Sequence, residues 1–148
     1  MKVFIGADHR GYELKEKIKS HLQSDYDIED CGALVHNPND DYTTFASRVA
    51  TNVAETPGTR GIIMCGSGVG VDIVANKFDG VRASIGKSIE QVTAGRIDDN
   101  FNILVIAADY TTEDEADDMI RAFLETEYEP NERRERRLKD IEEIEKIN

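Results

Sequence analysis

The sequence predicts a doubly wound α/β domain built on a sheet of five parallel strands. Short apolar segments alternate with helical patterns five times along the 148 residues. Three of these segments are continuous apolar runs, which is typical of strands that helices cover on both faces. The length suits a single domain, which we expect to span residues 1–148 and to need no disulfide.

Five short segments predict the strands of this sheet. The first ends at a glycine, the third runs directly into a glycine-rich loop, and the second is weakly apolar. Because parallel strands need crossover connections, each segment is followed by a stretch long enough to form a helix. The expected strands are Lys2–Ile5, Tyr26–Glu29, Gly61–Met64, Val81–Ile85 and Ile103–Ala107.

Apolar residues at helical spacing predict the helices between the strands. Ser88 is a suitable N-cap with Gln91 at the capping-box position, and Thr111 or Thr112 is suited to cap the next helix. The last helix has a narrow apolar stripe among many charges, and we expect it to pack on a partner subunit. The expected helices cover 11–22, the region of 45–53, 69–77, 88–97, the segment after 111 or 112, and 133–147.

Composition excludes several classes of protein. The chain carries 30 acidic and 18 basic residues, a net charge of −12, which argues against a nucleic-acid-binding protein. The acidic residues are spread widely, as on solvated faces and loops. No apolar run approaches the roughly 20 residues of a membrane span, and the N-terminal segment lacks a signal-peptide pattern. We expect a cytoplasmic protein whose two cysteines, Cys31 and Cys65, are free thiols.

The loop after the third strand is the strongest functional signal. Gly66, Gly68 and Gly70 alternate with Ser67 and Val69 before a helix begins. This spacing is neither the dinucleotide pattern G-x-G-x-x-G nor a P-loop. Exposed backbone N–H groups at a helix N-terminus still form an anion site in the general sense. From glycine spacing alone, a ligand site and a plain tight turn are equally good interpretations.

Cys65 favours the ligand site. It ends a buried strand, and the carboxyl ends of parallel strands meet at one edge of a sheet, so residues 7–9, 41–42 and 65–70 should lie near one another. We expect the following helix to lower the pKa of the thiol. A thiolate there would attack as a nucleophile or remove a proton from carbon. The alternative is a buried core cysteine without chemistry.

Several segments together resemble the ribose-5-phosphate isomerase B family, which includes the galactose-6-phosphate isomerase subunits. They are GADHRGYELKEKI at 6–18, DY at 41–42, GIIMCGSGVGVDIVANKFDGVRA at 61–83, NIL at 102–104, and EYEP with RRERRL near the end. The resemblance implies a Rossmann-like α/β/α sandwich. It also implies a homodimer or tetramer with active sites at the dimer interface, and a reaction that uses no metal or organic cofactor.

The resemblance also implies a reaction and its residues. An aldose phosphate and a ketose phosphate, ribose 5-phosphate and ribulose 5-phosphate in the first instance, interconvert through a cis-enediolate. Cys65 matches the base, and Ser67 matches a hydroxyl that moves a proton between two substrate oxygens. The remaining matches are substrate contacts: Asp8, His9, Tyr42 and the backbone of Gly66, Gly68, Val69 and Gly70.

Two arginines near the C-terminus complete the implied substrate contacts. The family clamps phosphate with two arginines four residues apart, a spacing that puts both on one helix face. Arg133 and Arg137 fit if one residue is inserted before them; without the insertion, Glu132 and Arg136 take these places. We prefer the insertion. The alternative is a solvated basic helix start.

The chain departs from the family pattern at three positions. Asp98 replaces the histidine that opens the sugar ring, Asp99 replaces an asparagine that contacts hydroxyls, and Asp109 stands where an arginine is usual. Asp98 takes over as the acid if burial near Asp99 raises its pKa. Otherwise the substrate is another sugar phosphate, such as galactose 6-phosphate or a tetrose phosphate without a ring. An aspartate at 109 is expected to repel a phosphate, and a non-catalytic sugar-phosphate-binding protein is a further alternative.

Overall fold

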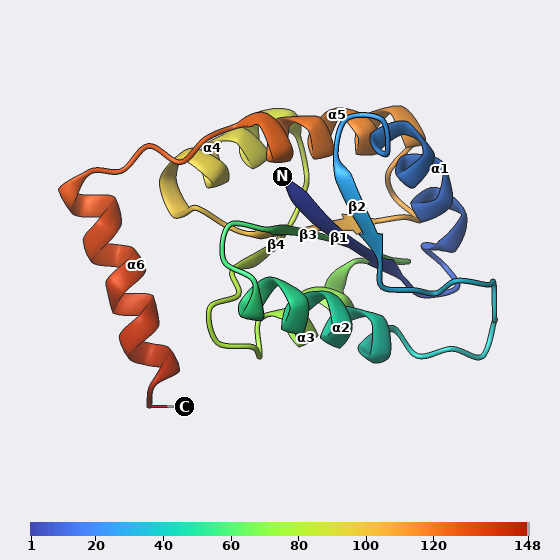
Figure 1. The fold of residues 1–148 in the computed structure, drawn as a ribbon, viewed down its shortest axis with the longest axis horizontal. Coiled ribbons are helices and arrows are strands. Elements are labelled where there is room, and N and C mark those ends of the chain that lie inside the picture. The colour runs from blue at the N-terminus through green and yellow to red at the C-terminus, as the bar shows by residue number, and fades with distance from the viewer. Residues whose placement is uncertain (148) are drawn as a thin grey trace.

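The computed structural model describes residues 1–147 and contains a five-stranded sheet in which every pairing is parallel (Figure 1). Asn148, the last residue of the expected domain, lies outside the described residues. The expected doubly wound, Rossmann-like sheet is confirmed. Across the sheet, the strands follow the order β2 (Asp27–Asp30), β1 (Lys2–Ala7), β3 (Arg60–Cys65), β5 (Ile103–Ala107) and β4 (Ala83–Ile85).

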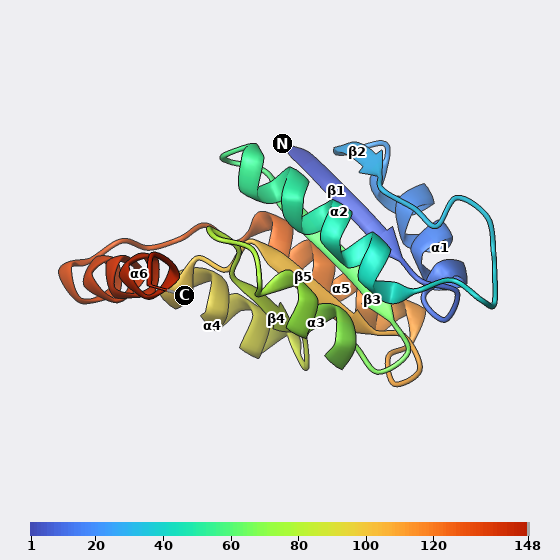
Figure 2. The ribbon, with the colours of Figure 1, turned by 90° about the horizontal axis from the view of Figure 1, so that it is seen from below.

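Helices cover both faces of the sheet (Figure 2). The first face carries α1 (Tyr12–Leu22), α4 (Ile89–Asp99) and α5 (Glu113–Glu125), and the opposite face carries α2 (Tyr42–Glu55) and α3 (Val69–Ala75). The last helix, α6 (Glu132–Glu145), stands apart from both layers and approaches the body at α4. Within residues 1–147, no helix has both the length and the apolar character that a membrane crossing requires.

The two helical layers bury alternate residues of the strands. Ile5 and Met64 pack in the core on the side of α1, α4 and α5, whereas Ile63 and Cys65 pack on the side of α2 and α3. All six residues of β3 are buried, as its continuous apolar run predicts. The Cys65 side chain therefore belongs to the α2–α3 side of the sheet.

Local hydrogen bonds explain how the elements begin and end. Ser88 caps α4 as expected, its hydroxyl accepting from the Gln91 N–H at 3.2 Å, but the Gln91 side chain accepts the Lys87 N–H instead of closing a capping box. Thr112 caps α5 as expected, and it forms a reciprocal capping box with Glu115. Strand β4 begins at Ala83 rather than Val81 because the Asn102 side chain accepts the Arg82 N–H at 2.8 Å, outside the ladder. The fourth strand is thus shorter than the apolar pattern suggests.

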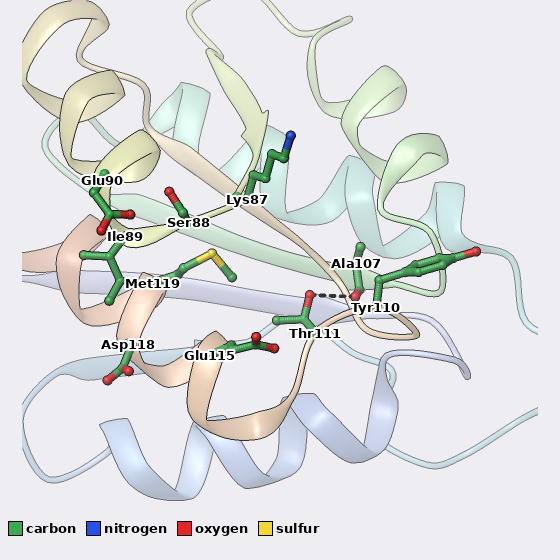
Figure 3. A pocket seen from close by; sticks show the side chains of 11 residues that line it. Lys87, Ser88, Ile89, Glu90, Ala107, Tyr110, Thr111, Glu115, Asp118 and Met119 are labelled. Carbon is green, nitrogen blue, oxygen red and sulfur yellow. Dashed lines mark hydrogen bonds between the residues drawn. The ribbon is translucent and has the colours of Figure 1, made fainter.

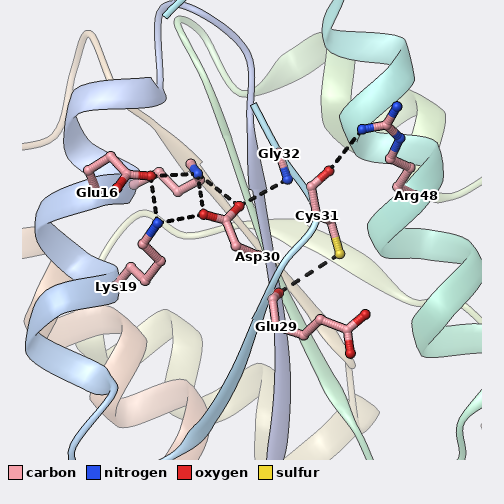
Figure 4. Close-up of polar contacts among 8 residues, drawn as sticks. Glu16, Lys19, Glu29, Asp30, Cys31, Gly32 and Arg48 are labelled. Carbon is pink, nitrogen blue, oxygen red and sulfur yellow. Dashed lines mark hydrogen bonds and ion pairs between the residues drawn. The ribbon is translucent and has the colours of Figure 1, made fainter. Parts of the chain in front are cut away.

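A buried lysine joins α1 to the end of β2. Lys15 is fully buried, and its Nζ lies 2.8 Å and 2.7 Å from the two carboxylate oxygens of Asp30. Lys19 and the backbone N–H of Gly32 also donate to Asp30, at 2.6 Å and 2.9 Å (Figure 4). The Gly32 carbonyl in turn accepts the Ala7 N–H at 2.8 Å, so this network supports the end of β1.

Candidate active site

The site lies at the carboxyl edge of the sheet between β1 and β3, whose connections cross on opposite faces of the sheet. Strands β1 and β3 are neighbours, with Ala7 paired to Met64, but β1 leads to α1 on one face and β3 leads to α3 on the other. The two connections therefore diverge at the carboxyl edge, which is where open α/β sheets bind ligands. This arrangement brings Asp8 and His9 to the loop that follows Cys65.

The Cys65 loop is anchored to the end of β5 by main-chain atoms. The Cys65 carbonyl accepts the Ala108 N–H at 2.9 Å, and the Gly66 carbonyl accepts the Asp109 N–H at 3.0 Å. Gly68 has φ of +76°, a conformation that favours glycine, and it caps α3. The glycine loop is therefore a fixed turn into a helix N-terminus, with backbone N–H groups grouped around the cysteine.

The thiol of Cys65 is 5% exposed and does not have the expected lowered pKa. Burial raises the pKa of the Cys65 thiol above its ordinary value, and this effect outweighs the N–H groups of Val71 and Gly68, which favour the thiolate. Asp8 raises the pKa further through its charge. The prediction of a helix-stabilised thiolate is thus wrong for this chain, because it counted the helix N-terminus and omitted desolvation.

Asp8 and His9 have different local roles. Asp8 is 4% exposed, and one carboxylate oxygen accepts the N–H groups of Arg10 and Gly11 at 3.0 Å and 3.1 Å, which fixes the turn into α1. His9 is held by Asp40, which accepts both its backbone N–H at 2.9 Å and its ring Nδ1 at 2.8 Å. Because an ionised carboxylate only accepts, Nδ1 carries a hydrogen and Nε2 is left for a ligand.

Tyr42 and Ser67 border the same loop. Tyr42 is the first residue of α2, and its ring covers Gly70: a Cβ added there would lie 2.7 Å from the ring carbon Cζ. Ser67 is exposed, and its hydroxyl accepts the Val69 N–H at 3.3 Å. The hydroxyl proton of Ser67 is therefore available to a ligand in front of the loop.

Two residues of this region were not predicted as functional. Asp40 belongs to an acidic stretch that resembles solvated loop, yet its side chain is only 9% exposed. Arg10 forms an ion pair with Asp109, and its guanidinium lies against Gly66. The aspartate at 109 was expected to repel a phosphate, but in the structure its charge is paired. No local pattern signals either contact, because the partners are 31 and 99 residues apart.

The other predicted residues lie elsewhere in the chain. Asp98 and Asp99 end α4, just before β5 begins, and so lie toward the amino edge of the sheet, opposite the Cys65 loop. The Asp98 side chain is 49% exposed and pairs with Arg134 of α6, so the burial that would make it an acid is absent here. Arg133 and Arg137 are exposed on α6.

A separate cavity of about 380 Å³ opens beside the site (Figure 3). It lies beyond β4 and β5, between the start of α4 at Ser88 and the start of α5 near Thr111. Its wall includes Ala107, which is paired with Cys65 in the sheet, but none of the predicted site residues. Residues 1–147 contain no group of three or more His, Cys, Asp or Glu side chains that could hold a metal ion.

Comparison with known proteins identifies the family. The sequence model described as Ribose/Galactose Isomerase matches residues 3–141. The chain belongs to the ribose/galactose isomerase family. It is 37% identical over 149 residues to the ribose-5-phosphate isomerase B of Mycobacterium tuberculosis, and the aligned region covers 100% of this chain and 92% of that protein. The resemblance of the sequence motifs to this family is therefore confirmed.

Solved structures of this family share the fold. The ribose-5-phosphate isomerase B of Mycoplasma genitalium with bound ribulose-5-phosphate has a TM-score of 0.95 at 35% identity, covering 99% of this chain and 97% of that one. The type B ribose 5-phosphate isomerase of Trypanosoma cruzi has a TM-score of 0.95 at 32% identity, covering 100% of both chains. The likeness thus extends over the whole domain.

Proposed function

We propose that this chain interconverts ribose 5-phosphate and ribulose 5-phosphate through a cis-enediolate, with Cys65 as the base. The observation that carries the proposal is the position of Cys65: it ends β3 at the point where the β1 and β3 connections diverge, inside a loop of backbone N–H groups. A thiol surrounded by such donors has the two components that proton transfer at carbon needs, a base and a site for the developing oxyanion.

The proposed reaction moves two protons and changes no oxidation state overall. The Cys65 thiolate removes the proton from C2 of the aldose, and the electron pair forms the C1–C2 double bond of the enediolate. Ser67 moves a proton between O1 and O2, and Cys65 returns its proton to C1. Backbone N–H groups of Gly66–Gly70 stabilise the oxyanion, whose charge appears only during the reaction. His9, held by Asp40, contacts the distal part of the substrate.

We propose further that two chains build each active site. The residues at the Cys65 edge are held by β1, β3 and α2, whereas Asp98, Asp99, Arg133 and Arg137 belong to α4 and α6. Helix α6 stands away from its own body, and Ile141, Ile144 and Ile147 are 37%, 55% and 83% exposed. An apolar face of this kind favours packing on a second copy, which would bring the second group to the partner's Cys65 loop.

A different sugar phosphate is the second candidate substrate. The observation that favours it is Asp98, which is half-exposed and paired with Arg134 rather than placed as a buried acid. A tetrose phosphate has no ring to open and would not need that acid, and galactose 6-phosphate belongs to the same reaction class. A binding protein without chemistry would need the loop and positive charge but not the Cys65 thiol.

The deciding experiment follows the C2 proton of ribose 5-phosphate by proton NMR in D₂O. We expect loss of the C2 signal with growth of ribulose 5-phosphate, abolished in Cys65→Ala. Cys31→Ala is the matched control, because Cys31 is also a buried free thiol but contacts Asn52 on the outer part of α2. Exchange that persists in Cys65→Ala contradicts the assignment of the base. Turnover of a tetrose or hexose phosphate alone would favour the second substrate.

The two-chain site has its own test. Cys65→Ala and the double variant Arg133→Ala/Arg137→Ala should each be inactive alone. After the two are unfolded together and refolded, mixed dimers carry one intact site each, so roughly a quarter of the wild-type activity should return. Mixing Cys65→Ala with Ser67→Ala should restore none, because both changes lie in the same half. Equal recovery in the two mixtures, or none in either, contradicts the shared site.

A further inference from the structure

Arg10 lies directly on the Cys65 loop. A Cβ added at Gly66 would overlap Cζ and Nε of Arg10, so the guanidinium would have to move. The guanidinium therefore occupies the space that a side chain at position 66 would need. Glycine at this position gives the arginine access to the loop backbone.

Asp109 holds the guanidinium in this place. Its carboxylate pairs with Arg10, and its own N–H donates to the Gly66 carbonyl at 3.0 Å, so both residues converge on Gly66. The side chains of Arg10 and Asp109 are 56% and 34% exposed. Within residues 1–147, Asp109 is the single side-chain partner of a guanidinium that has five N–H donors. The remaining donors belong to a side chain that is more than half exposed.

Arg10 and Cys65 approach the loop from opposite sides. The Cys65 side chain packs in the core beneath α2 and α3, whereas Arg10 comes from the turn that leads into α1. A sugar phosphate likewise has its reacting carbons at one end and a charged group at the other. A phosphoryl group binding to a chain of net charge −12 needs a local cation, and a guanidinium binds phosphate through two parallel hydrogen bonds.

We propose that Arg10, positioned by Asp109, binds the phosphoryl group of the substrate and selects phosphorylated over neutral sugars. This inference rests on the proposed function and adds a residue to it. The cation is then the Arg10 guanidinium in the connection after β1, whereas the segment after β5 carries the anionic Asp109. His9, the residue before Arg10, has its Nδ1 on Asp40, so Nε2 is the ring nitrogen left for a ligand.

Binding measured without catalysis tests the inference. In a Cys65→Ala background, the dissociation constant of ribose 5-phosphate is measured by titration calorimetry with and without Arg10→Ala. Loss of a charge-assisted contact should weaken binding by about 10- to 100-fold. Arg121→Ala is the matched control: Arg121 also pairs with an aspartate, Asp117, but on the outer surface of α5, and binding should stay within about twofold.

Kinetics of the enzyme with Cys65 intact separate binding from structure. Arg10→Ala should raise KM far more than it lowers kcat, and should raise the inhibition constant of inorganic phosphate by a similar factor. Arg10→Lys, which keeps the charge and loses the forked geometry, should fall between. A value for Arg10→Ala equal to that of Arg121→Ala, or an unchanged phosphate inhibition constant, overturns the inference. Wild type that neither binds nor exchanges ribose 5-phosphate instead overturns the proposed function.

Discussion

Replacing Lys15 by methionine tests how much a buried charge stabilises the end of β1. The Lys15 ammonium is fully buried and donates to both carboxylate oxygens of Asp30, at 2.8 Å and 2.7 Å, and to Glu16 at 2.8 Å. Methionine has a similar length and fills the same space, so the substitution adds no large cavity. The change therefore isolates the loss of charge-assisted hydrogen bonds.

The expected loss in the free energy of unfolding depends on the hydrogen bonds that Asp30 retains in Lys15→Met. Lys19 and the Gly32 N–H still donate to it, at 2.6 Å and 2.9 Å, and its side chain is 14% exposed. Removing one partner of a buried ion pair costs about 3–5 kcal/mol when the remaining charge keeps no other partner. A single hydrogen bond to a charged group contributes about 1.5–3 kcal/mol. We expect a loss of about 2–3 kcal/mol, which lowers Tm by about 4–12 °C for a domain of this size.

Urea unfolding at one fixed chain concentration measures this loss. Burial works to raise the pKa of Asp30, but hydrogen bonds from Lys15, Lys19 and Gly32 outweigh it and hold the pKa below its ordinary value. A lowered carboxyl pKa stabilises the fold above the unfolded value, about 3.9, and the benefit is lost as pH falls through the folded pKa. Lys15→Met should therefore weaken the acid dependence of unfolding as well.

A double variant tests the same argument. Lys15→Met/Asp30→Leu should be less stable than Lys15→Met alone, because Lys19 and the Gly32 N–H lose the carboxylate that Asp30 still offers them in the single variant. A loss below about 0.5 kcal/mol for Lys15→Met, the range of ordinary surface substitutions, would refute the argument. So would a double variant that is more stable than the single one.

Three further predictions concern the site. Because burial raises the pKa of Cys65, kcat/KM should rise with pH and level off only above the ordinary thiol pKa of about 8.5. A plateau of kcat/KM already at neutral pH would contradict the assignment of a base that must first lose its proton. Gly70→Ala should raise KM, because the new Cβ displaces the Tyr42 ring. Tyr42 is 40% exposed, so the free energy of unfolding should change by less than about 1 kcal/mol; an unchanged KM would show that Tyr42 does not contact the substrate. Asp40→Asn should lower kcat/KM about tenfold and alter the His9 ring signals in NMR; unaltered ring signals would show that Asp40 does not set the tautomer.

Hydrophobic pattern was sufficient to predict most of the fold. The β3 run and the helical spacing of Ile18 and Leu22 reflect burial that the structure confirms. The pattern misplaced a strand boundary where a side chain replaces a backbone hydrogen-bond partner. The Asn102 side chain accepts the Arg82 N–H, and β4 is shorter for this reason. The pattern also gave no sign that Lys15 is buried, because Asp30, whose carboxylate compensates for the desolvation of the lysine, lies 15 residues away on another element.

The site was predicted in part for a similar reason. A motif shows which residues follow one strand, so Cys65, Ser67 and the glycines could be found together. Pairs formed across the fold, such as Arg10 with Asp109, leave no local pattern in a single sequence. The pKa of Cys65 was misjudged because the helix N-terminus is visible in the sequence, whereas the degree of desolvation is a property of the packed core.

The main-chain anchoring of the Cys65 loop bears on how this enzyme family diverges. The bond from the Asp109 N–H to the Gly66 carbonyl uses no side-chain atom, so every residue except proline can form it. Position 109 is therefore free to drift between cationic and anionic side chains while the loop keeps its shape. In this chain an anionic side chain at position 109 and a cationic one at position 10 lie against a loop whose main-chain bond requires neither.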